Sequence, residues 1–243
     1  MNEAYVLFRQ GHLLSGVLDK AHFGSSSFSL VHCCYELYGG AIAGQLLSCL
    51  GRLFTAFLQL RGFTLGVEDI ILKPEMKKPM AKITKKAKKC GYEVLAQVFQ
   101  GKDLNNKQEF LDGYKRMHQN PDESFMKEID LAYKGSVDKF QNNLTNICFP
   151  NGLIKKFPYN NLQLMIQSGA KGSTVNSMQM SCLLGQQELE GKRPRLMPNG
   201  NTLPSFLPYD PSPNSGGFIS NSFMSGLTPQ EYFFHCMAGR EVI

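Results

Sequence analysis

The sequence lacks several patterns that would assign a protein to a class directly. It has no run of about 18 uncharged apolar residues, and its N-terminus lacks the basic stretch and apolar core of a secretory signal. Its seven cysteines form no C-x-x-C pair or other metal-ligand spacing. We therefore predict an intracellular protein that does not enter a membrane and whose thiols are reduced and mostly buried.

Clusters of catalytic residue types are also missing. There is no D-x-D-x-D motif for paired magnesium ions, and the adjacent acidic pairs at residues 68–69 and 122–123 are interpreted as solvated surface charge. No histidine with a supporting carboxylate is suggested by spacing near Cys182 or Cys236. The residues alone predict neither a catalytic centre nor a metal site.

The first 70 residues are rich in glycine, serine and apolar residues. Apolar side chains recur every three or four residues over residues 29–38 and 41–60, which predicts two buried helices separated by a Gly-Gly break. Residues 13–18 are predicted to form a short strand or turn, and residues 63–71 a short extended segment. Because this region has little polar surface, we expect neighbouring protein to cover it.

A lysine-rich segment follows. Eight of the seventeen residues 73–89 are lysine, which favours a solvated helix face over a phosphate-binding patch because the run has no arginine or aromatic side chain for stacking. Residues 102–121 are predicted to be a loop or connector. Apolar residues from Phe125 to Ile147 then predict a long amphipathic helix. Residues 79–149 are thus predicted to form a projecting helical hairpin.

The last third is predicted to alternate short helices with a proline-rich loop. Asn160 or Asn161 can cap a helix through residue 168, and a further helix extends to about residue 185. Seven prolines between Pro194 and Pro229 predict loop structure, and the last of them opens a terminal helix. The predicted fold class is therefore mixed α+β, dominated by helices.

Lys171 is the sharpest candidate binding residue. It stands between Gly169 and Gly172 at a predicted helix start, where free backbone N–H groups and an ammonium group favour an anion such as a triphosphate. The segment is not a P-loop, because Ala170 precedes the lysine and Gly172 follows it. An exposed turn lysine is the alternative interpretation.

Two further polar features have competing interpretations. Residues 186–193 concentrate amides and charges after a helix, which is typical of a polar channel or of a solvated helix end. His235 lies on the terminal helix pattern, where a core histidine is the expected role. Neither pattern by itself indicates a reaction.

Three groups of segments together resemble the largest subunit of eukaryotic RNA polymerases, in that family's order and approximate spacing. They are residues 13–20 (LLSGVLDK) with 31–36 (VHCCYE) and 61–69 (RGFTLGVED), residues 168–176 (SGAKGSTVN) with 185–193 (GQQELEGKR), and residues 226–241 (GLTPQEYFFHCMAGRE). The VLDK and CMAGRE forms resemble the polymerase I version, and polymerase III is the nearest alternative.

The resemblance implies a partial, multidomain segment. Residues 1–70 would belong to the pore region, residues 71–227 to the funnel with its helical hairpin, and residues 228–243 to the start of the bridge helix. Lys171 aligns with a lysine that contacts the incoming nucleoside triphosphate. The resemblance places eight other polar residues beside the pore or the bridge helix: Gln186, Gln187, Lys192, Arg193, Gln230, His235, Arg240 and Glu241.

The implied function is nucleotidyl transfer by DNA-directed RNA polymerase I, which synthesises ribosomal RNA precursor in the nucleus, at the nucleolus. Expected partners are the second-largest subunit, other polymerase subunits, template DNA, RNA and nucleoside triphosphates. The family's magnesium ligands and trigger loop are absent from this chain, and Val242-Ile243 replaces the family's Gly-Leu-Ile-Asp continuation. We therefore expect the chain alone to be inactive.

Two other functions stay open at this point. The chain could be a truncated, non-catalytic product that acts as an assembly or interaction module. It could also be an independent nucleotide-binding enzyme, an interpretation that rests only on Lys171.

Overall fold

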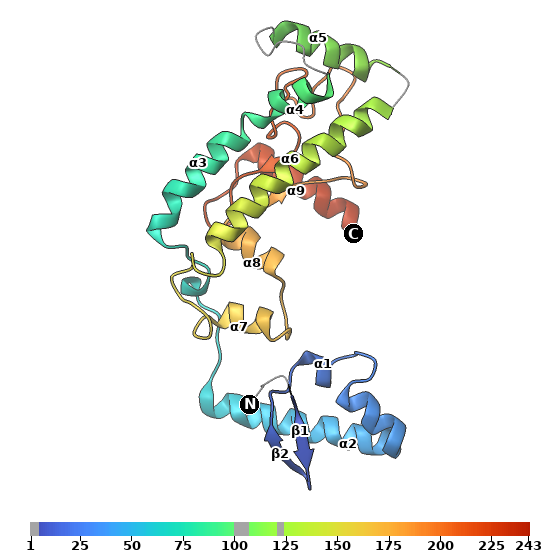
Figure 1. Ribbon diagram of the computed structural model, residues 1–243, viewed down its shortest axis with the longest axis vertical. Coiled ribbons are helices and arrows are strands. Elements are labelled where there is room, and N and C mark those ends of the chain that lie inside the picture. The colour runs from blue at the N-terminus through green and yellow to red at the C-terminus, as the bar shows by residue number, and fades with distance from the viewer. Residues whose placement is uncertain (1–4, 100–106, 121–123) are drawn as a thin grey trace. The chain divides into compact units, whose positions relative to one another are not determined.

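The computed structural model describes residues 5–99, 107–120 and 124–243, which form two compact units (Figure 1). The first unit comprises Met1–Asp69 and Phe157–Ser173, and the second comprises Ile70–Lys156 and Thr174–Ile243. Helices dominate both units, and each has one two-stranded antiparallel sheet. The predicted mixed α+β, helix-dominated class is confirmed.

The first unit combines a small hairpin with one long helix. Its elements are β1 (Leu7–Arg9), β2 (His12–Ser15), α1 (Lys20–Phe23), α2 (Leu30–Arg61), the 3-10 turn η1 (Val67–Asp69) and α7 (Asn161–Gln167). Strand β2 confirms the predicted strand in this region, whereas its partner β1 was not expected. The predicted extended segment over residues 63–71 is partly wrong, because η1 turns the chain there.

Helix α2 unites the two helices that the apolar spacing predicted. Ser29 caps it by accepting a hydrogen bond from the His32 backbone N–H at 3.2 Å. At Gly39 the backbone has φ 82° and ψ 172°, which interrupts the helical geometry. A positive φ of this kind is accessible to glycine at little cost, so the predicted Gly-Gly break is confirmed as a kink.

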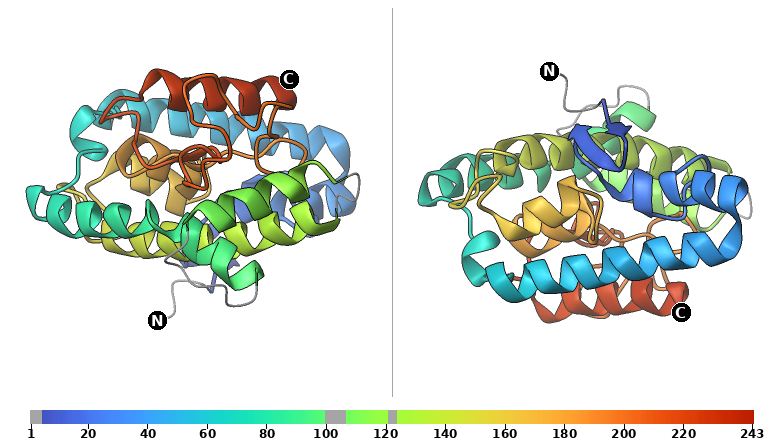
Figure 2. Two further views of the ribbon diagram at one scale, coloured as in Figure 1. Left: turned by 90° about the horizontal axis from the view of Figure 1, so that it is seen from above. Right: turned by 90° about the horizontal axis from the view of Figure 1, so that it is seen from below.

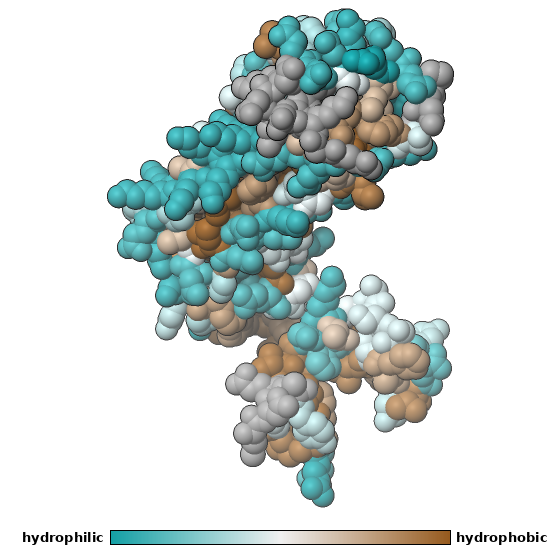
Figure 3. All heavy atoms as spheres, turned by 45° about the horizontal axis from the view of Figure 1, so that its top comes forward, coloured by the Kyte–Doolittle hydropathy of each residue, from teal (hydrophilic) through white to brown (hydrophobic). Residues whose placement is uncertain are grey.

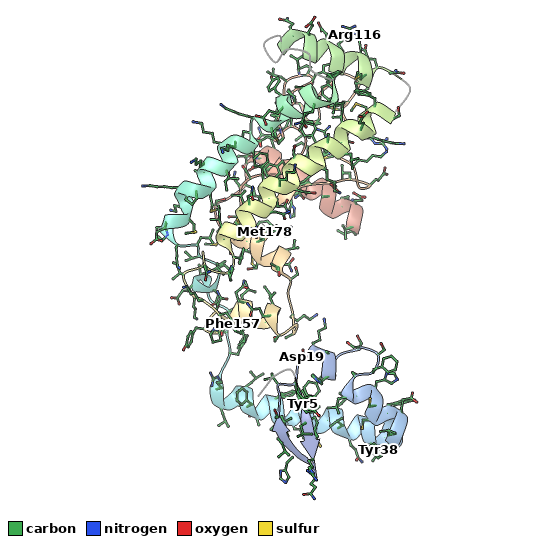
Figure 4. All side chains as sticks on the ribbon, viewed as in Figure 1. Tyr5, Asp19, Tyr38, Arg116, Phe157 and Met178 are labelled. Atoms are coloured by element: carbon green, nitrogen blue, oxygen red, sulfur yellow. The ribbon has the colours of Figure 1, made fainter. Side chains whose placement is uncertain are left out.

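The apolar faces of α2 remain largely uncovered within the first unit. Phe54 packs edge-to-face on Phe23 of α1, with ring centroids 5.9 Å apart. Among the described residues of this unit, however, Ala43 and Leu162 are the only hydrophobic side chains that are buried. Figure 3 shows hydrophobic residues at the surface of this unit. The aromatic side chain of Tyr38 on α2, labelled in Figure 4, is also exposed.

The composition of α2 also bears on membrane insertion. Its most apolar window of 18 residues has a mean hydropathy of 1.5, and 6% of that window is buried. By length and composition α2 could therefore cross a membrane. The sequence had predicted no membrane entry, because it contains no run of about 18 uncharged apolar residues. The composition of α2 is weak evidence for a span, since core helices of water-soluble proteins pass the same test.

Segment 157–173 is tied to the first unit by asparagine side chains. Asn160 caps α7 by accepting a hydrogen bond from the Gln163 backbone N–H at 2.9 Å, which confirms the predicted cap. The same side chain donates to the Asp69 carbonyl at 2.7 Å, and Asn161 donates to the Thr64 carbonyl at 2.6 Å. These bonds hold α7 against η1.

The second unit is built around one long helix. Its elements are η2 (Pro74–Met76), α3 (Lys77–Ala87), α4 (Cys90–Val98), α5 (Lys107–His118), α6 (Ser124–Cys148), α8 (Thr174–Ser181), β3 (Gly185–Gln186), β4 (Phe218–Ile219) and α9 (Pro229–Val242). Helices α3 and α4 pack along α6, as the two views of Figure 2 also show. The two limbs of the predicted hairpin are present, and the first is divided into α3 and α4.

Helix α5 corrects the predicted connector at residues 102–121. Residues 102–106 and 121 of that prediction lie outside the described residues, but residues 107–118 are helical. Tyr114 is buried, and Leu111 packs against the same cluster. The polar composition hid this three-residue apolar spacing, and burial against α6 decides the structure.

Two apolar clusters hold α6 in place. One joins α6 to α3, α4, α8 and β4 through Ala87, Cys90, Val137, Leu144, Cys148, Met178, Cys182, Leu183 and Phe218. The other joins α6 to α4, α5 and the loop after β3 through Val94, Leu95, Tyr114, Ile129, Tyr133 and Tyr209. The apolar residues of α6 recur every three or four positions, so the predicted long amphipathic helix is confirmed.

The C-terminal helices agree with the sequence prediction, except that α8 is shorter than predicted. Thr228 and Glu231 form a reciprocal capping box around Pro229 at the start of α9, which confirms the predicted terminal helix. Helix α8 ends at Ser181 rather than near residue 185. The chain leaves helical geometry because the Leu184 N–H donates to the Asn221 carbonyl at 2.9 Å and β3 then pairs with β4.

The cysteines are less buried than expected. Cys90, Cys148 and Cys182 are buried, Cys34 is intermediate, and Cys33, Cys49 and Cys236 are exposed. The prediction of mostly buried thiols is therefore wrong. The prediction fails mainly because Cys33, Cys34 and Cys49 lie on α2, whose side chains are largely uncovered.

Candidate functional site

The polar segment after β3 meets helix α9 within the second unit. Gly185 begins β3 with a φ of 84°, and a Cβ at this position would lie 2.5 Å from Gln141 Oε1 on α6. Gly185 pairs with Ile219 and Gln186 with Phe218. A glycine at this position therefore lets the following amides approach both α6 and β4.

The two glutamines have different roles. The Gln186 side chain donates to the backbone carbonyls of Gln187 and Gly216 at 2.9 and 2.7 Å. The Gln187 side chain is buried, and its Oε1 lies 3.3 Å from Nδ1 of His235 on α9. Gln186 thus braces the loop, whereas Gln187 links it to α9.

His235 is partly buried and has two contacts. Besides Gln187, it packs edge-to-face on Phe223, with ring centroids 5.5 Å apart. A histidine held by an amide and an aromatic ring is oriented rather than free to rotate. His235 therefore lies at the edge of the core, and not inside it as the helix pattern had led us to expect.

Arg193 lies in the interior of the second unit. Its Nε is 2.7 Å from Oδ1 of Asp130 on α6, and its guanidinium lies 3.9 Å from the Tyr133 ring centroid. Burial alone would lower the pKa of Arg193, but Tyr114, Asp130 and Tyr133 together raise it. The positive charge is therefore retained and held in one orientation.

Tyr133 ties this ion pair to the backbone. Its hydroxyl donates to the Gly91 carbonyl at 3.1 Å and also to the Pro211 carbonyl. Burial raises the pKa of the Tyr133 hydroxyl, despite the opposing effect of Arg193, so the group stays protonated and can donate. Helices α4 and α6 and the loop after β3 are thus held together by one side chain.

Lys192 and Arg193 line two neighbouring cavities. One, of about 330 Å³, is also lined by Tyr114, His118 and Arg195. The other, of about 190 Å³, is also lined by Gln186, Glu188 and Lys134. The first reaches the size range of small-molecule sites.

Acidic residues connect the same segment to α6 and α9. Glu241 of α9 accepts a hydrogen bond from the Glu190 backbone N–H at 2.6 Å. Lys134 of α6 lies 2.8 Å from Oε1 of Glu188. The C-terminal end of α9 is therefore anchored to residues 185–193.

The structure brings together six of the eight predicted polar residues. They are Gln186, Gln187, Lys192, Arg193, His235 and Glu241. The side chains of Gln230 and Arg240 form no hydrogen bond or ion pair with other residues in the described part of the chain. The role beside the pore or the bridge helix stays a prediction for all eight residues.

Lys171 belongs to the first unit and is exposed. Gly169 and Gly172 on either side of it have φ angles of 73° and 84°, as the predicted glycine turn requires. Helix α8 begins at Thr174, in the second unit. The phosphate contact predicted for Lys171 stays a prediction.

Sequence reasoning missed the partners of Arg193. Asp130 and Tyr133 lie three residues apart, which places them on one face of α6. The periodic pattern identified Tyr133 only as a core residue and gave Asp130 no role. An acidic residue on the apolar side of a helix was the signal that a buried cation lies opposite.

Comparison with known proteins identifies the family. The models for RNA polymerase Rpb1 domain 3 and domain 4 match residues 1–70 and 112–219. The chain is 48% identical over 241 residues to DNA-directed RNA polymerase I subunit RPA1 of Drosophila melanogaster. It is 42% identical over 240 residues to subunit RPA190 of Saccharomyces cerevisiae. The chain belongs to the RNA polymerase largest-subunit family.

The matches cover the chain far more completely than they cover its relatives. The two alignments include 99% and 98% of this chain, but 15% and 14% of the Drosophila and yeast subunits. The resemblance drawn from the three groups of motifs is confirmed. The polar segment at residues 185–193 lies inside the domain 4 match of this polymerase family.

Proposed function

We propose that the chain is part of the catalytic subunit of DNA-directed RNA polymerase I, which makes ribosomal RNA precursor in the nucleus, at the nucleolus. The observation that supports this most is the identity of 42–48% to polymerase I subunits of insect, yeast and slime mould origin over nearly the whole chain. All of these relatives are polymerase I subunits, which favours polymerase I over polymerase III.

Within that enzyme, residues 1–70 would line the substrate pore, residues 71–227 the funnel, and residues 228–243 would begin the bridge helix. The Gln187–His235 and Glu190–Glu241 contacts support this assignment, because they fix the middle and the C-terminal end of α9 against the segment after β3. Movement of α9 would strain these contacts. The segment would therefore position the helix rather than make or break bonds.

Magnesium is not assigned to this chain. Among the described residues, no three histidine, cysteine, aspartate or glutamate side chains gather where they could hold an ion. The two ions that nucleotidyl transfer requires would be held by carboxylates elsewhere in the subunit. This chain would contribute substrate passage and helix position.

Lys171 would contact the incoming triphosphate. The residue is exposed between two glycines of positive φ, so its ammonium group can reach a ligand without displacing another side chain. A lysine supplies a compact positive charge for phosphate oxygens. The proposal does not require any P-loop geometry.

The uncovered apolar residues of α2 support a role inside a larger assembly. Leu37, Phe57 and Leu60 are 73%, 55% and 91% exposed. A soluble chain rarely leaves so much apolar surface open to water. We assign its cover to polymerase subunits, the second-largest subunit among them.

The decisive experiment assays a tagged largest subunit in its assembled polymerase. We expect it to co-purify with the second-largest subunit and to incorporate nucleotides on a DNA template. The Lys171→Ala variant is expected to raise KM for nucleoside triphosphates about tenfold or more, a loss typical of one charge-assisted phosphate contact. Lys156→Ala, which removes another exposed lysine, is the matched control.

Three results would contradict the proposal. They are failure of the subunit to assemble, equal KM values for the two lysine variants, and magnesium-dependent incorporation by the purified 243-residue chain alone. The second candidate function, an assembly or interaction module, is favoured by the exposed face of α2. That candidate predicts that the chain added in excess reduces assembly of the complete subunit.

A further inference from the structure

Two buried cysteines meet in the core between α6 and α8. Cys148 is the last residue of α6, and Cys182 directly follows α8. Their Sγ atoms are 2.8 Å apart, and the side chains are 0% and 3% exposed. Met178, on the same helix turn as Cys182, is labelled on α8 in Figure 4.

The geometry of this pair is close to that of a covalent link. A disulfide needs a sulfur–sulfur distance of about 2.05 Å, so a small approach from 2.8 Å would suffice. Cys148 ends α6 and Cys182 directly follows α8, so both sulfurs lie where a helix gives way to a loop. The residues are 34 positions apart, so a bond would close a loop of moderate length.

The surroundings leave each thiol with sulfur and carbonyl partners. Cys182 lies 3.8 Å from the Leu144 carbonyl, and Cys148 lies 3.8 Å from the Met80 thioether. Thr145 does not compete for the thiols, because its hydroxyl lies 2.9 Å from both the Gln141 carbonyl and the Met178 sulfur, which are its acceptors. The sulfur of each cysteine is therefore the closest reactive group available to the other.

We propose that Cys148 and Cys182 are an oxidation site that closes to a disulfide when the protein meets a peroxide. The Cys148 thiolate attacks one oxygen of hydrogen peroxide, which gives a sulfenic acid and, after protonation of the leaving hydroxide, one water. The Cys182 sulfur then attacks the Cys148 sulfur, loses its proton and displaces a second water. Two thiols and one peroxide thus yield one disulfide and two waters.

The order of the two sulfurs follows from their hydrogen bond. The hydrogen bond between the two sulfurs lowers the pKa of Cys148, whereas the same bond, together with burial, raises the pKa of Cys182. Cys148 is therefore the sulfur that ionises first and Cys182 the one that resolves the sulfenic acid. Because both are buried, oxidation requires local opening and proceeds slowly.

Cys90 provides a matched control in the same apolar cluster. It is equally buried, but it has no sulfur contact within the described residues. Burial, assisted by Glu93, raises the pKa of its thiol to about 11. Cys90 is therefore expected to stay reduced under conditions that oxidise the pair.

The test treats the full 243-residue chain with hydrogen peroxide, in native buffer and in guanidinium chloride, followed by alkylation of free thiols and peptide mapping without reductant. We expect a Cys148–Cys182 linked peptide, lighter by two hydrogen masses, to dominate in native buffer only. The linked protein should melt on the order of 5–10 °C higher, and reductant should reverse the shift. Cys90→Ser should leave both readouts unchanged.

Two results would overturn the inference. One is a yield of the linked peptide in native buffer no higher than in guanidinium chloride. The other is a peroxide-induced rise in melting temperature that persists in Cys182→Ala. If that variant fails to fold, the mapping of the unsubstituted chain decides alone. The inference rests only on contacts within the second unit, so its failure would leave the proposed polymerase function untouched.

Discussion

The two units differ in how much of their stability lies within the chain. In the described part of the second unit, Leu95, Ile129, Tyr133 and Leu144 are at most 1% exposed, and Arg193 is paired with Asp130. In that of the first unit, large apolar residues such as Leu60 remain open to water. The second unit therefore contains its own core, whereas the described part of the first unit buries few of its apolar side chains.

This difference teaches how a domain of a large assembly can be encoded. Hydrophobic burial is the main favourable contribution to folding, and a unit that lacks it must obtain it from partners. Apolar spacing along a helix reports which face will be covered, but not which protein covers it. Substitutions in the two units should therefore have unequal effects. One of the following four experiments compares the units directly, and the other three measure how tightly the second unit is packed.

The largest effect is expected for Gly91→Ala in the second unit. A Cβ on Gly91 would lie 1.7 Å from the Pro211 carbonyl oxygen, and backbone cannot move aside as a side chain can. We expect a loss of about 4 kcal/mol or more in the free energy of unfolding, measured by urea titration. Gly135→Ala on α6, with nothing within 4 Å, is the control and should stabilise slightly. Equal effects would show that α4 does not pack here.

The next experiment compares the units directly with two leucines. Leu95→Ala removes a side chain that is 0% exposed and should cost about 2–5 kcal/mol. Leu53→Ala, at a position 62% exposed on α2, should change the stability of the isolated chain by less than about 0.5 kcal/mol. A large cost at Leu53 would break the comparison, because it would reveal a core in the first unit.

A smaller change in the free energy of unfolding is expected when the pH is raised and the Cys90 thiol ionises. Its folded pKa of about 11 lies above the ordinary 9.0, so the unfolded chain loses the thiol proton first as pH rises. The stabilisation is complete below pH 9 and is lost toward pH 11, by about 2 kcal/mol. Urea midpoints should fall over this window in the natural chain and less in Cys90→Ala. Identical slopes would exclude burial of this thiol.

The smallest effect is expected at the surface of the second unit. Lys134 and Glu188 form an ion pair at 2.8 Å, but the lysine side chain is 49% exposed. Solvent screening leaves such pairs little net energy, so Lys134→Ala should cost less than about 0.5 kcal/mol in urea titrations at physiological salt. A loss above 1 kcal/mol that vanishes in high salt would show that the pair is shielded from water.

Much of the fold could be predicted from the spacing of apolar residues and from the residues that cap or interrupt helices. The kink at Gly39, the Asn160 cap and the capping box at Thr228 each follow from local chemistry that a few adjacent residues specify. Helix α5 could not be read in this way. Its polar sequence resembles a connector until Tyr114 is buried against α6, which is a long-range event.

The same distinction applies to the candidate site: the sequence indicated the polar segment, but only the structure identified its partners. The motif at residues 185–193 pointed to the polar segment, but its partners Asp130 and Tyr133 stand more than fifty positions earlier in the chain. Nothing in local spacing pairs Arg193 with α6. The same holds for Gln187 and His235, whose contact spans 48 positions.

By itself, the sequence determined the family, the helical class and the positions of caps and breaks, because these depend on residue order and short-range hydrogen bonds. The tertiary structure decided which polar groups pair, how deeply Arg193 is held and that Cys148 meets Cys182. It also revealed that α2 is left uncovered. The physical reason is that burial depends on contacts between residues that are far apart in the sequence, and local residue order does not specify which of them meet.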